Sequence, residues 1–205
     1  MNLRKTNEWI YYIYDYAPKY QWDWRNRSKK AVRLSENILQ YKNMKEPAFT
    51  SFVDDLSDGI IELSNEILTE NIALVGIPKS AVGVESPVCK SIKAILEDLE
   101  YIEDEDGYTQ TLLDYSTLLR RIRPLPSAHS YRGREKRTYE QLKSSLRCSQ
   151  SDLSDPDTSY IILDDITTEG LSMEVARDIL VEHGADEDNI YALVLARTAN
   201  RYEPL

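Results

Sequence analysis

The stretch YIILDDITTEGLS, residues Tyr160 to Ser172, decides the fold that we expect for this chain. Its first four residues are apolar and have the length of a strand buried on both faces. Two acids follow at once, and a hydroxyl-rich turn with one glycine then leads into an amphipathic helix. Strands that alternate with helices in this way predict an α/β fold, with a mostly parallel sheet flanked by helices.

The chemical groups of this stretch suit a phosphorylated sugar. A helix that begins after a glycine-containing loop presents backbone N–H groups and the positive end of its dipole, and both attract phosphate. The carboxylates of Asp164 and Asp165 stand just before the loop. They could hold sugar hydroxyls or a hydrated magnesium ion. An acidic strand-to-helix turn in an unrelated α/β domain is the alternative interpretation.

A second strand and loop occur in IALVGIPKSAVG, residues 72 to 83. Ile72 to Ile77 predicts a short apolar strand, and Pro78-Lys79-Ser80 ends it in a tight loop. Ser86-Pro87 is a favourable helix start, because proline fits the first helical position. Ligands of parallel sheets bind beyond the carboxyl ends of the strands. We therefore expect the two loops to share one site.

Further helices are expected over residues 28–41, over a segment capped by Thr50 or Ser51, and over Ser172 to His183, with Gly184 after its end. A last strand is expected over Ile190 to Ala196. We expect a core of residues 51–205, preceded by a segment, residues 1–50, that is rich in aromatic residues.

The aromatic residues of that segment have two interpretations. They could form a stacking platform for a base, or a packed lobe or homodimer contact. The cluster consists of Trp9, Tyr11, Tyr12, Tyr14, Tyr16, Tyr20, Trp22 and Trp24.

Charge is distributed unevenly along the 205 residues. The net charge of −10 makes nucleic acid an unlikely general partner, because duplex binding depends on neutralisation of phosphates by Lys and Arg. Between Arg120 and Arg147, nine Lys or Arg and two acids give +7, so the remainder carries −17. Residues 123–137 hold two prolines, a glycine and most of these cations, and they predict a mobile loop. A solvated basic surface is the alternative.

Other classes of site and location are disfavoured. No apolar run approaches the roughly 18 residues that span a bilayer, and the N-terminus lacks the pattern of a signal peptide, so we expect a cytoplasmic protein without membrane association. Cys89 and Cys148 are expected as buried reduced thiols, with a disulfide as the alternative. Two histidines are too few for a histidine-rich metal site.

The acid pair and its loop resemble the signature that binds 5-phosphoribosyl 1-pyrophosphate (PRPP) in type I phosphoribosyltransferases. The resemblance covers roughly residues 70–200 and is nearest to the ComF-like branch of that superfamily. Thr138 and Gln141 resemble a T-x-x-Q feature there, and Gly184-Ala185 followed by Ala192 to Thr198 resembles its C-terminal helix and strand. Two positions depart from the pattern: the family often has Thr, Ala or Arg at the position of Glu169, and a small or hydroxyl residue at that of Leu171.

This resemblance implies a division of roles in the site. Asp164 and Asp165 would hold the ribose 2′ and 3′ hydroxyls, and would contact Mg²⁺ indirectly, through PRPP or water. The 5′-phosphate would be held by Thr167, Thr168, Gly170 and Ser172. The pyrophosphate would be held by two groups of residues, the loop Pro78, Lys79 and Ser80, and the flexible loop residues Arg132, Arg134, Lys136 and Arg137.

The implied activity is the transfer of ribose 5-phosphate from PRPP to a nucleobase or other nitrogen nucleophile, with release of pyrophosphate and Mg²⁺ as cofactor. Glu169 and His129 are the candidate acid/base groups. The aromatic N-terminal segment is the candidate hood, which in this family is the variable part that covers the acceptor. A non-catalytic PRPP sensor, or an interaction protein that keeps the fold without the site, are the alternatives.

Overall fold

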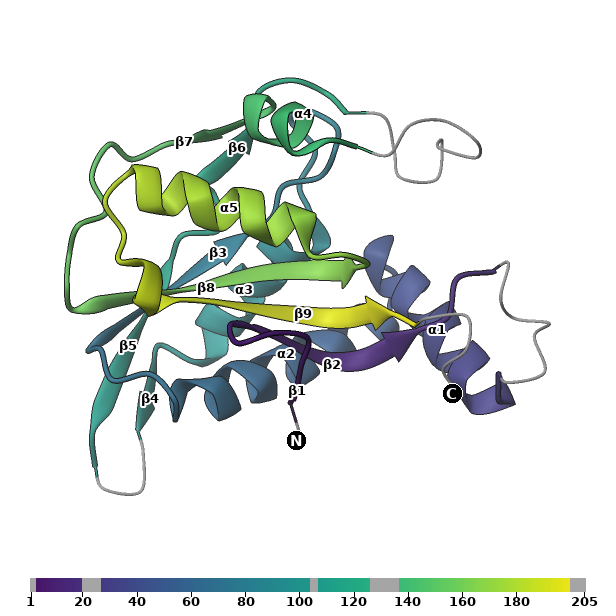
Figure 1. The fold of residues 1–205 in the computed structure, drawn as a ribbon. Helices are drawn as coiled ribbons and strands as arrows, with labels where there is room; N and C mark the ends of the chain where they lie inside the picture. The colour runs from purple at the N-terminus through teal and green to yellow at the C-terminus, as the bar shows by residue number, and fades with distance from the viewer. Residues whose placement is uncertain (1–2, 20–26, 104–106, 126–136, 200–205) are drawn as a thin grey trace.

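A seven-stranded sheet forms the centre of the molecule (Figure 1). The computed structural model describes residues 3–19, 27–103, 107–125 and 137–199. The strand order is β1-β2-β9-β8-β3-β5-β4, in which β2, β9, β8, β3 and β5 are parallel to their neighbours and the edge strands β1 and β4 are antiparallel. The strands are β1 Arg4–Lys5, β2 Ile10–Tyr16, β3 Asn71–Gly76, β4 Tyr101–Glu103, β5 Thr109–Asp114, β8 Thr158–Thr167 and β9 Ile190–Thr198. The expected mostly parallel α/β sheet is confirmed.

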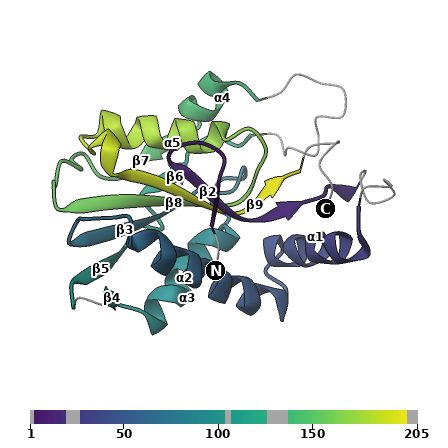
Figure 2. The same cartoon turned by 60° about the horizontal axis from the view of Figure 1, so that its bottom comes forward.

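Helices cover both faces of this sheet. One face carries α1, α2 and α3, which Figure 2 brings forward. The other carries α5 together with α4 and a small second sheet made of β6 and β7 (Figure 1). The bounds are α1 Lys29–Lys42, α2 Ala48–Ser64, α3 Pro87–Asp98, α4 Tyr139–Ser144, α5 Leu171–Glu182, β6 Leu119–Arg121 and β7 Leu146–Cys148, with a short 3₁₀ helix η3 Glu187–Asn189 before β9.

The central strands are apolar throughout because both of their faces are buried. In β8, Ile161 and Leu163 pack on the side of α1 to α3, whereas Tyr160 and Ile162 pack on the side of α5. Successive residues of a strand point to opposite faces, so a strand covered on both sides needs an uninterrupted apolar run. This requirement explains the sequence from Tyr160 to Leu163.

Strand β8 continues further than its apolar run. It includes Asp164 and Asp165 and ends at Thr167, because β9 pairs with it that far, with Asp164 opposite Val194 and Thr167 opposite Arg197. The acid pair therefore lies inside the strand, near its end, where residues on either side of it pair with β9. An apolar run alone cannot indicate such an extension.

The N-terminal segment differs from its expected place. Strand β2 lies inside the central sheet, parallel to β9, and its Tyr11 and Tyr12 are buried in the two opposite cores. The expected boundary at residue 50 thus does not separate these residues from the sheet. The partner strand β9 is about 180 residues away in sequence, which is why local patterns did not reveal the pairing. Tyr20, Trp22 and Trp24 lie outside the described residues.

The ends of the helices follow their capping residues. Ser86 accepts a hydrogen bond from the backbone N–H of Cys89, with Pro87 in the first turn, as expected for α3. Gly184 has a φ of +102° just after α5, the left-handed conformation that glycine adopts without strain. Helix α2 begins at Ala48, two residues before the earlier of the two expected caps. Cys89 and Cys148 are free and buried, as predicted.

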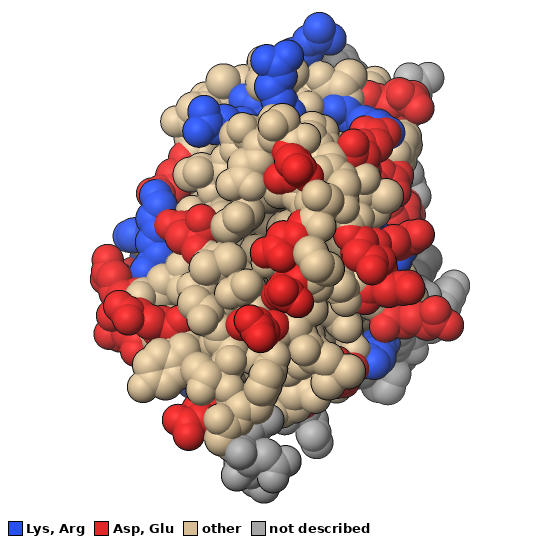
Figure 3. All heavy atoms as spheres, turned by 90° about the vertical axis from the view of Figure 1, so that its left-hand side faces the viewer, with Lys and Arg blue, Asp and Glu red and all other residues tan. Residues whose placement is uncertain are grey.

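The amino end of the parallel strands is strongly acidic (Figure 3). Exposed acids stand in the segments that lead into β8 and β9, among them Asp152, Asp155, Asp157, Asp186 and Glu187. Among the described residues, no helix combines the length and the apolarity needed to cross a membrane.

Candidate functional site

A cavity of about 450 Å³ opens at the carboxyl ends of β8 and β3. Small-molecule sites typically have volumes of about 300–1,000 Å³. The structure brings the two loops of the sequence analysis together here, since residues 78–80 and 164–172 all line the cavity. Further lining residues come from other elements: Lys42, Ile77, Ser86, Pro87, Val88, Arg121, Arg137 and Leu142.

Both acids of the pair line this cavity. Asp164 Oδ1 accepts the N–H of Asp165 at 2.8 Å, and Asp165 Oδ1 accepts the N–H of Ile166 at 2.7 Å. These local bonds hold both side chains in place. No hydrogen bond within the described part of the chain reaches Oδ2 of either acid. Each acid of this cavity therefore keeps one oxygen that can accept a hydrogen bond from a hydroxyl group of a ligand.

Asp164 and Asp165 have different electrostatic surroundings. Burial, and then the charge of Asp165, raise the pKa of Asp164 to about 7, although Lys42 and Arg121 oppose this shift. Lys42 places its Nζ 2.8 Å from Asp165 Oδ1. Burial lowers the pKa of Lys42, but the charge and hydrogen bond of Asp165 outweigh burial and raise it above its ordinary value. Asp165 therefore has the ammonium group of Lys42 as its counter-ion, whereas Asp164 has no such contact with Lys42.

The loop after the acid pair is shaped by its own side chains. Thr167 Oγ1 accepts the N–H of Gly170 at 3.0 Å, and the hydroxyl of Thr168 lies 3.1 Å from that of Thr198 in β9. Thr167 and Gly170 are thus bonded to each other, whereas Ser172 lines the cavity from the first turn of α5. Gly170 is the N-cap residue of α5. Its φ is +80°, and no side chain caps the start of the helix. An uncapped helix start leaves N–H groups for an anionic ligand.

The opposite wall of the cavity is basic. Arg121 is only 8% exposed, and its Nε and Nη2 donate to the carbonyls of Lys79 (3.1 Å) and Pro78 (3.3 Å), while Nη1 donates to Ser145 Oγ. It makes no salt bridge with any carboxylate of the described residues. Burial, and then the nearby Arg137, lower the pKa of Arg121 to about 10. A buried cation without a counter-ion is costly, and an anionic ligand would relieve that cost.

Arg121 and Lys42 were not found from the sequence. In β6, Leu119 and Arg121 are buried and Arg120 is exposed, so Arg121 points inward. A strand of three residues is too short for this alternation to be recognised in the sequence. Lys42 lies more than 120 residues before the acid it contacts. Only the packing of α1 brings the two together.

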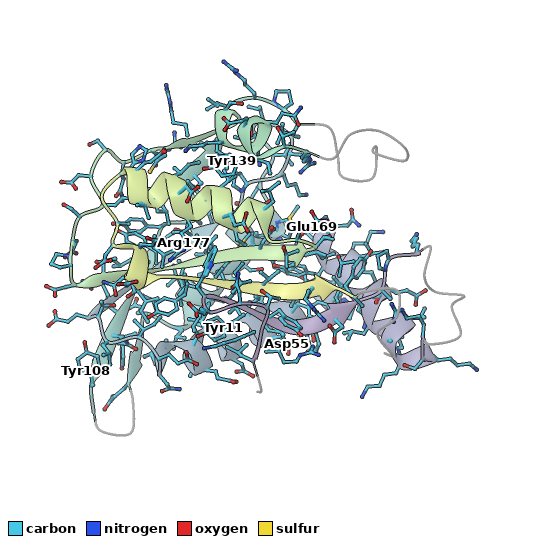
Figure 4. All side chains as sticks on the ribbon, viewed as in Figure 1. Tyr11, Asp55, Tyr108, Tyr139, Glu169 and Arg177 are labelled. Atoms are coloured by element: carbon cyan, nitrogen blue, oxygen red, sulfur yellow. The ribbon has the colours of Figure 1, made fainter. Side chains whose placement is uncertain are left out.

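The remaining predicted residues have different outcomes. Glu169 is exposed and lies where β8 leads into α5, at the rim of the cavity (Figure 4). Arg137 lines the cavity. Thr138 and Gln141 form a capping box at the start of α4, which gives them a structural role. His129, Arg132, Arg134 and Lys136 lie outside the described residues.

The acid pair fits an indirect contact with Mg²⁺ better than a resident ion. No group of three or more His, Cys, Asp or Glu suited to a metal occurs in the described ranges, and Asp165 already carries Lys42 as its counter-ion. Mg²⁺ is usually held by one or two carboxylates together with phosphate groups of a substrate. Asp164 and Asp165 could therefore contact such an ion through its other ligands.

No protein-family model matches this chain, and no curated protein matches it. The function is therefore argued from the chemistry of the cavity.

Proposed function

We propose that the protein binds PRPP with Mg²⁺ and transfers ribose 5-phosphate to a nucleobase or another nitrogen nucleophile, as a phosphoribosyltransferase of type I resembling the ComF-like branch. One observation carries the proposal. A single cavity combines two acids, an uncapped helix start and a buried arginine that forms no salt bridge with the described carboxylates. PRPP has a matching group for each: a ribose diol, a 5′-phosphate and a pyrophosphate.

In this proposal the ribose hydroxyls donate to Oδ2 of Asp164 and Asp165. The 5′-phosphate accepts hydrogen bonds from the start of α5 and from Ser172 and the loop hydroxyls. The pyrophosphate lies along Arg121, Arg137 and the loop of Pro78, Lys79 and Ser80. Arg132, Arg134 and Lys136, the other candidates for the pyrophosphate, lie outside the described residues.

The reaction breaks the bond between C1′ and the pyrophosphate oxygen and forms a bond between C1′ and the acceptor nitrogen. The transition state has oxocarbenium character, and fixed cations stabilise the departing pyrophosphate. Mg²⁺, bound with PRPP, supplies further charge neutralisation of the leaving group. Glu169 or His129 would accept the proton that the acceptor nitrogen loses.

Calorimetry tests the ligand. We expect PRPP with Mg²⁺ to bind the wild-type protein, and the double variant Asp164→Asn with Asp165→Asn to lose this binding. The matched control changes two exposed acids of the acidic end, Asp157→Asn with Asp188→Asn, which removes the same charge far from the cavity. Equal PRPP affinity of the acid-pair variant and the control would contradict the site.

A second experiment separates the enzyme from a sensor. A non-catalytic PRPP-sensing protein is the second candidate, because Glu169, one of the two departures from the residues usual in the family's loop, lines the cavity. Pyrophosphate release should be measured with a panel of nucleobases. Release with at least one base supports the enzyme, whereas tight PRPP binding without release for any base supports the sensor.

A further inference from the structure

Lys42 is the last residue of α1, and its ammonium group reaches the acid pair of β8. Its Nζ contacts Asp165 Oδ1 at 2.8 Å, the same oxygen that accepts the N–H of Ile166. The side chain of Asp165 is 11% exposed and that of Lys42 is 38% exposed. Helix α1 lies beyond the carboxyl end of the sheet (Figure 1), so it can deliver this side chain to the cavity. A cation in the last turn is also favoured by the helix dipole.

Two adjacent carboxylates that face one cavity would otherwise attract a divalent cation. Mg²⁺ and Mn²⁺ prefer carboxylate and water oxygens, and Mg²⁺ demands near-octahedral geometry with several waters retained. Lys42 places a positive charge within hydrogen-bond distance of one of these carboxylates. A divalent ion on the pair would have to displace this ammonium group or accept repulsion from it.

We infer that the ammonium group of Lys42 prevents a divalent metal ion from binding to Asp164 and Asp165. Ribose 5-phosphate then binds at Asp164 and Asp165 without metal, and metal enters only with a ligand that carries it on its own pyrophosphate. The statement about ribose 5-phosphate rests on the proposed function. The statement about metal exclusion does not, because it concerns only Lys42 and the two acids.

Mn²⁺ alone is the probe for metal exclusion, followed by electron paramagnetic resonance of the free ion. We expect the variant Lys42→Met to bind one Mn²⁺ at least tenfold more tightly than the wild-type protein. This gain should disappear when Asp165→Asn is added to Lys42→Met. Lys42→Arg keeps the charge and should behave as the wild type. Lys45→Met is the matched control, because Lys45 is an exposed lysine just after α1.

Equal Mn²⁺ affinities of the wild-type protein and of Lys42→Met, whether tight or immeasurably weak, would overturn the inference. Circular dichroism and thermal unfolding identify a variant that has lost its fold. If Lys42→Met fails to fold, Lys42→Gln is the second variant, and the same comparison decides the result.

Calorimetry with ribose 5-phosphate tests the ligand part. The affinity of the wild-type protein for ribose 5-phosphate should be the same, within twofold, in EDTA and in excess Mg²⁺. The variant Lys42→Met should bind ribose 5-phosphate weakly in EDTA and more tightly when Mg²⁺ is added. Strongly Mg²⁺-dependent binding by the wild type would overturn the inference. Absence of ribose 5-phosphate binding under both conditions would instead overturn the proposed function, and the Mn²⁺ comparison would still decide the role of Lys42.

Discussion

Asp164 is an acid of the cavity whose protonation differs from that of an exposed aspartate. Its pKa of about 7 in the folded protein lies above its ordinary value of 3.8, and burial is the main cause. The folded state therefore favours the protonated form. The stability that this group contributes is fully present below pH 4 and is lost as pH rises through 7.

We expect Asp164→Asn to raise the free energy of unfolding at pH 8 and to leave it nearly unchanged at pH 4. The pKa lies about three units above its ordinary value and one unit corresponds to about 1.4 kcal/mol, so a gain of up to about 4 kcal/mol is expected at pH 8. Urea unfolding at pH 4, 6 and 8 measures it. Asp157→Asn, at an exposed acid, is the control. Parallel pH profiles for wild type and Asp164→Asn would contradict the expectation.

Arg121 joins the loop of Pro78 and Lys79 to the small second sheet. We expect Arg121→Met to destabilise the protein by ~1–3 kcal/mol, because the carbonyls of Pro78 and Lys79 lose their donor. Binding of inorganic pyrophosphate, measured by calorimetry, should weaken at least tenfold.

The neighbouring residue provides the control for Arg121. Arg120→Met removes the same charge from an exposed position of β6 and should change both quantities little. Arg121→Lys keeps the charge without the planar fork of donors, so it should retain part of the pyrophosphate affinity while losing loop stability. If Arg120→Met and Arg121→Met weaken pyrophosphate binding equally, the effect is one of net charge rather than of position.

At the scale of elements, the junction between β8 and α5 depends on Gly170. Its φ of +80° disfavours any residue with a Cβ, and a Cβ there would lie 3.2 Å from Ile10 Cδ1. We expect Gly170→Ala to cost ~1–2 kcal/mol of stability, measured by thermal unfolding. Ribose 5-phosphate affinity should fall as well, because the start of α5 would move.

Gly107→Ala is the matched control for this junction. Gly107 has nearly the same φ, +81°, but a Cβ there would meet nothing within 4 Å. Gly107→Ala should lower the stability only by the cost of the strained backbone conformation, and it should leave the affinity for ribose 5-phosphate unchanged. A loss of ribose 5-phosphate affinity in Gly107→Ala as large as in Gly170→Ala would mean that general destabilisation, not the position of α5, causes the loss.

Elements with their own local signals were predicted well. Ser86-Pro87 marks the start of α3, and Gly184 marks the end of α5, because capping is decided by the few residues around a helix terminus. Helix α2 and the end of β8 were misplaced by a few residues. The end of β8 is set by its pairing with β9, which contributes hydrogen bonds that no local pattern contains.

At the scale of the whole molecule, the two ends of the sheet have opposite character. The cavity with Lys42, Arg121 and Arg137 lies at the carboxyl end, and the acids of Figure 3 cover the amino end. A cavity lined by cations attracts anions to itself even on a protein of negative net charge. The overall charge of −10 is therefore compatible with a phosphorylated ligand.

The N-terminal segment should be indispensable for folding. Strand β2 pairs with β9, and Ile10, Tyr11 and Ile13 are buried in the cores. We expect a truncated chain of residues 51–205 to lose cooperative thermal unfolding, because it would expose one side of β9 and apolar surface on both faces. A cooperative transition and a native-like circular dichroism spectrum from residues 51–205 would contradict this and support a separable core.

The sequence by itself determined the alternation of strands and helices, the burial of the central strands and the placement of two polar loops at strand ends. These features depend on side-chain period and capping, which are local. Only the tertiary structure decided that β2 joins the sheet, that Arg121 is buried beside the loop of Pro78 and Lys79, and that Lys42 pairs with Asp165. Each of these depends on contacts between residues more than 40 positions apart, whose pairing is decided by how the elements pack.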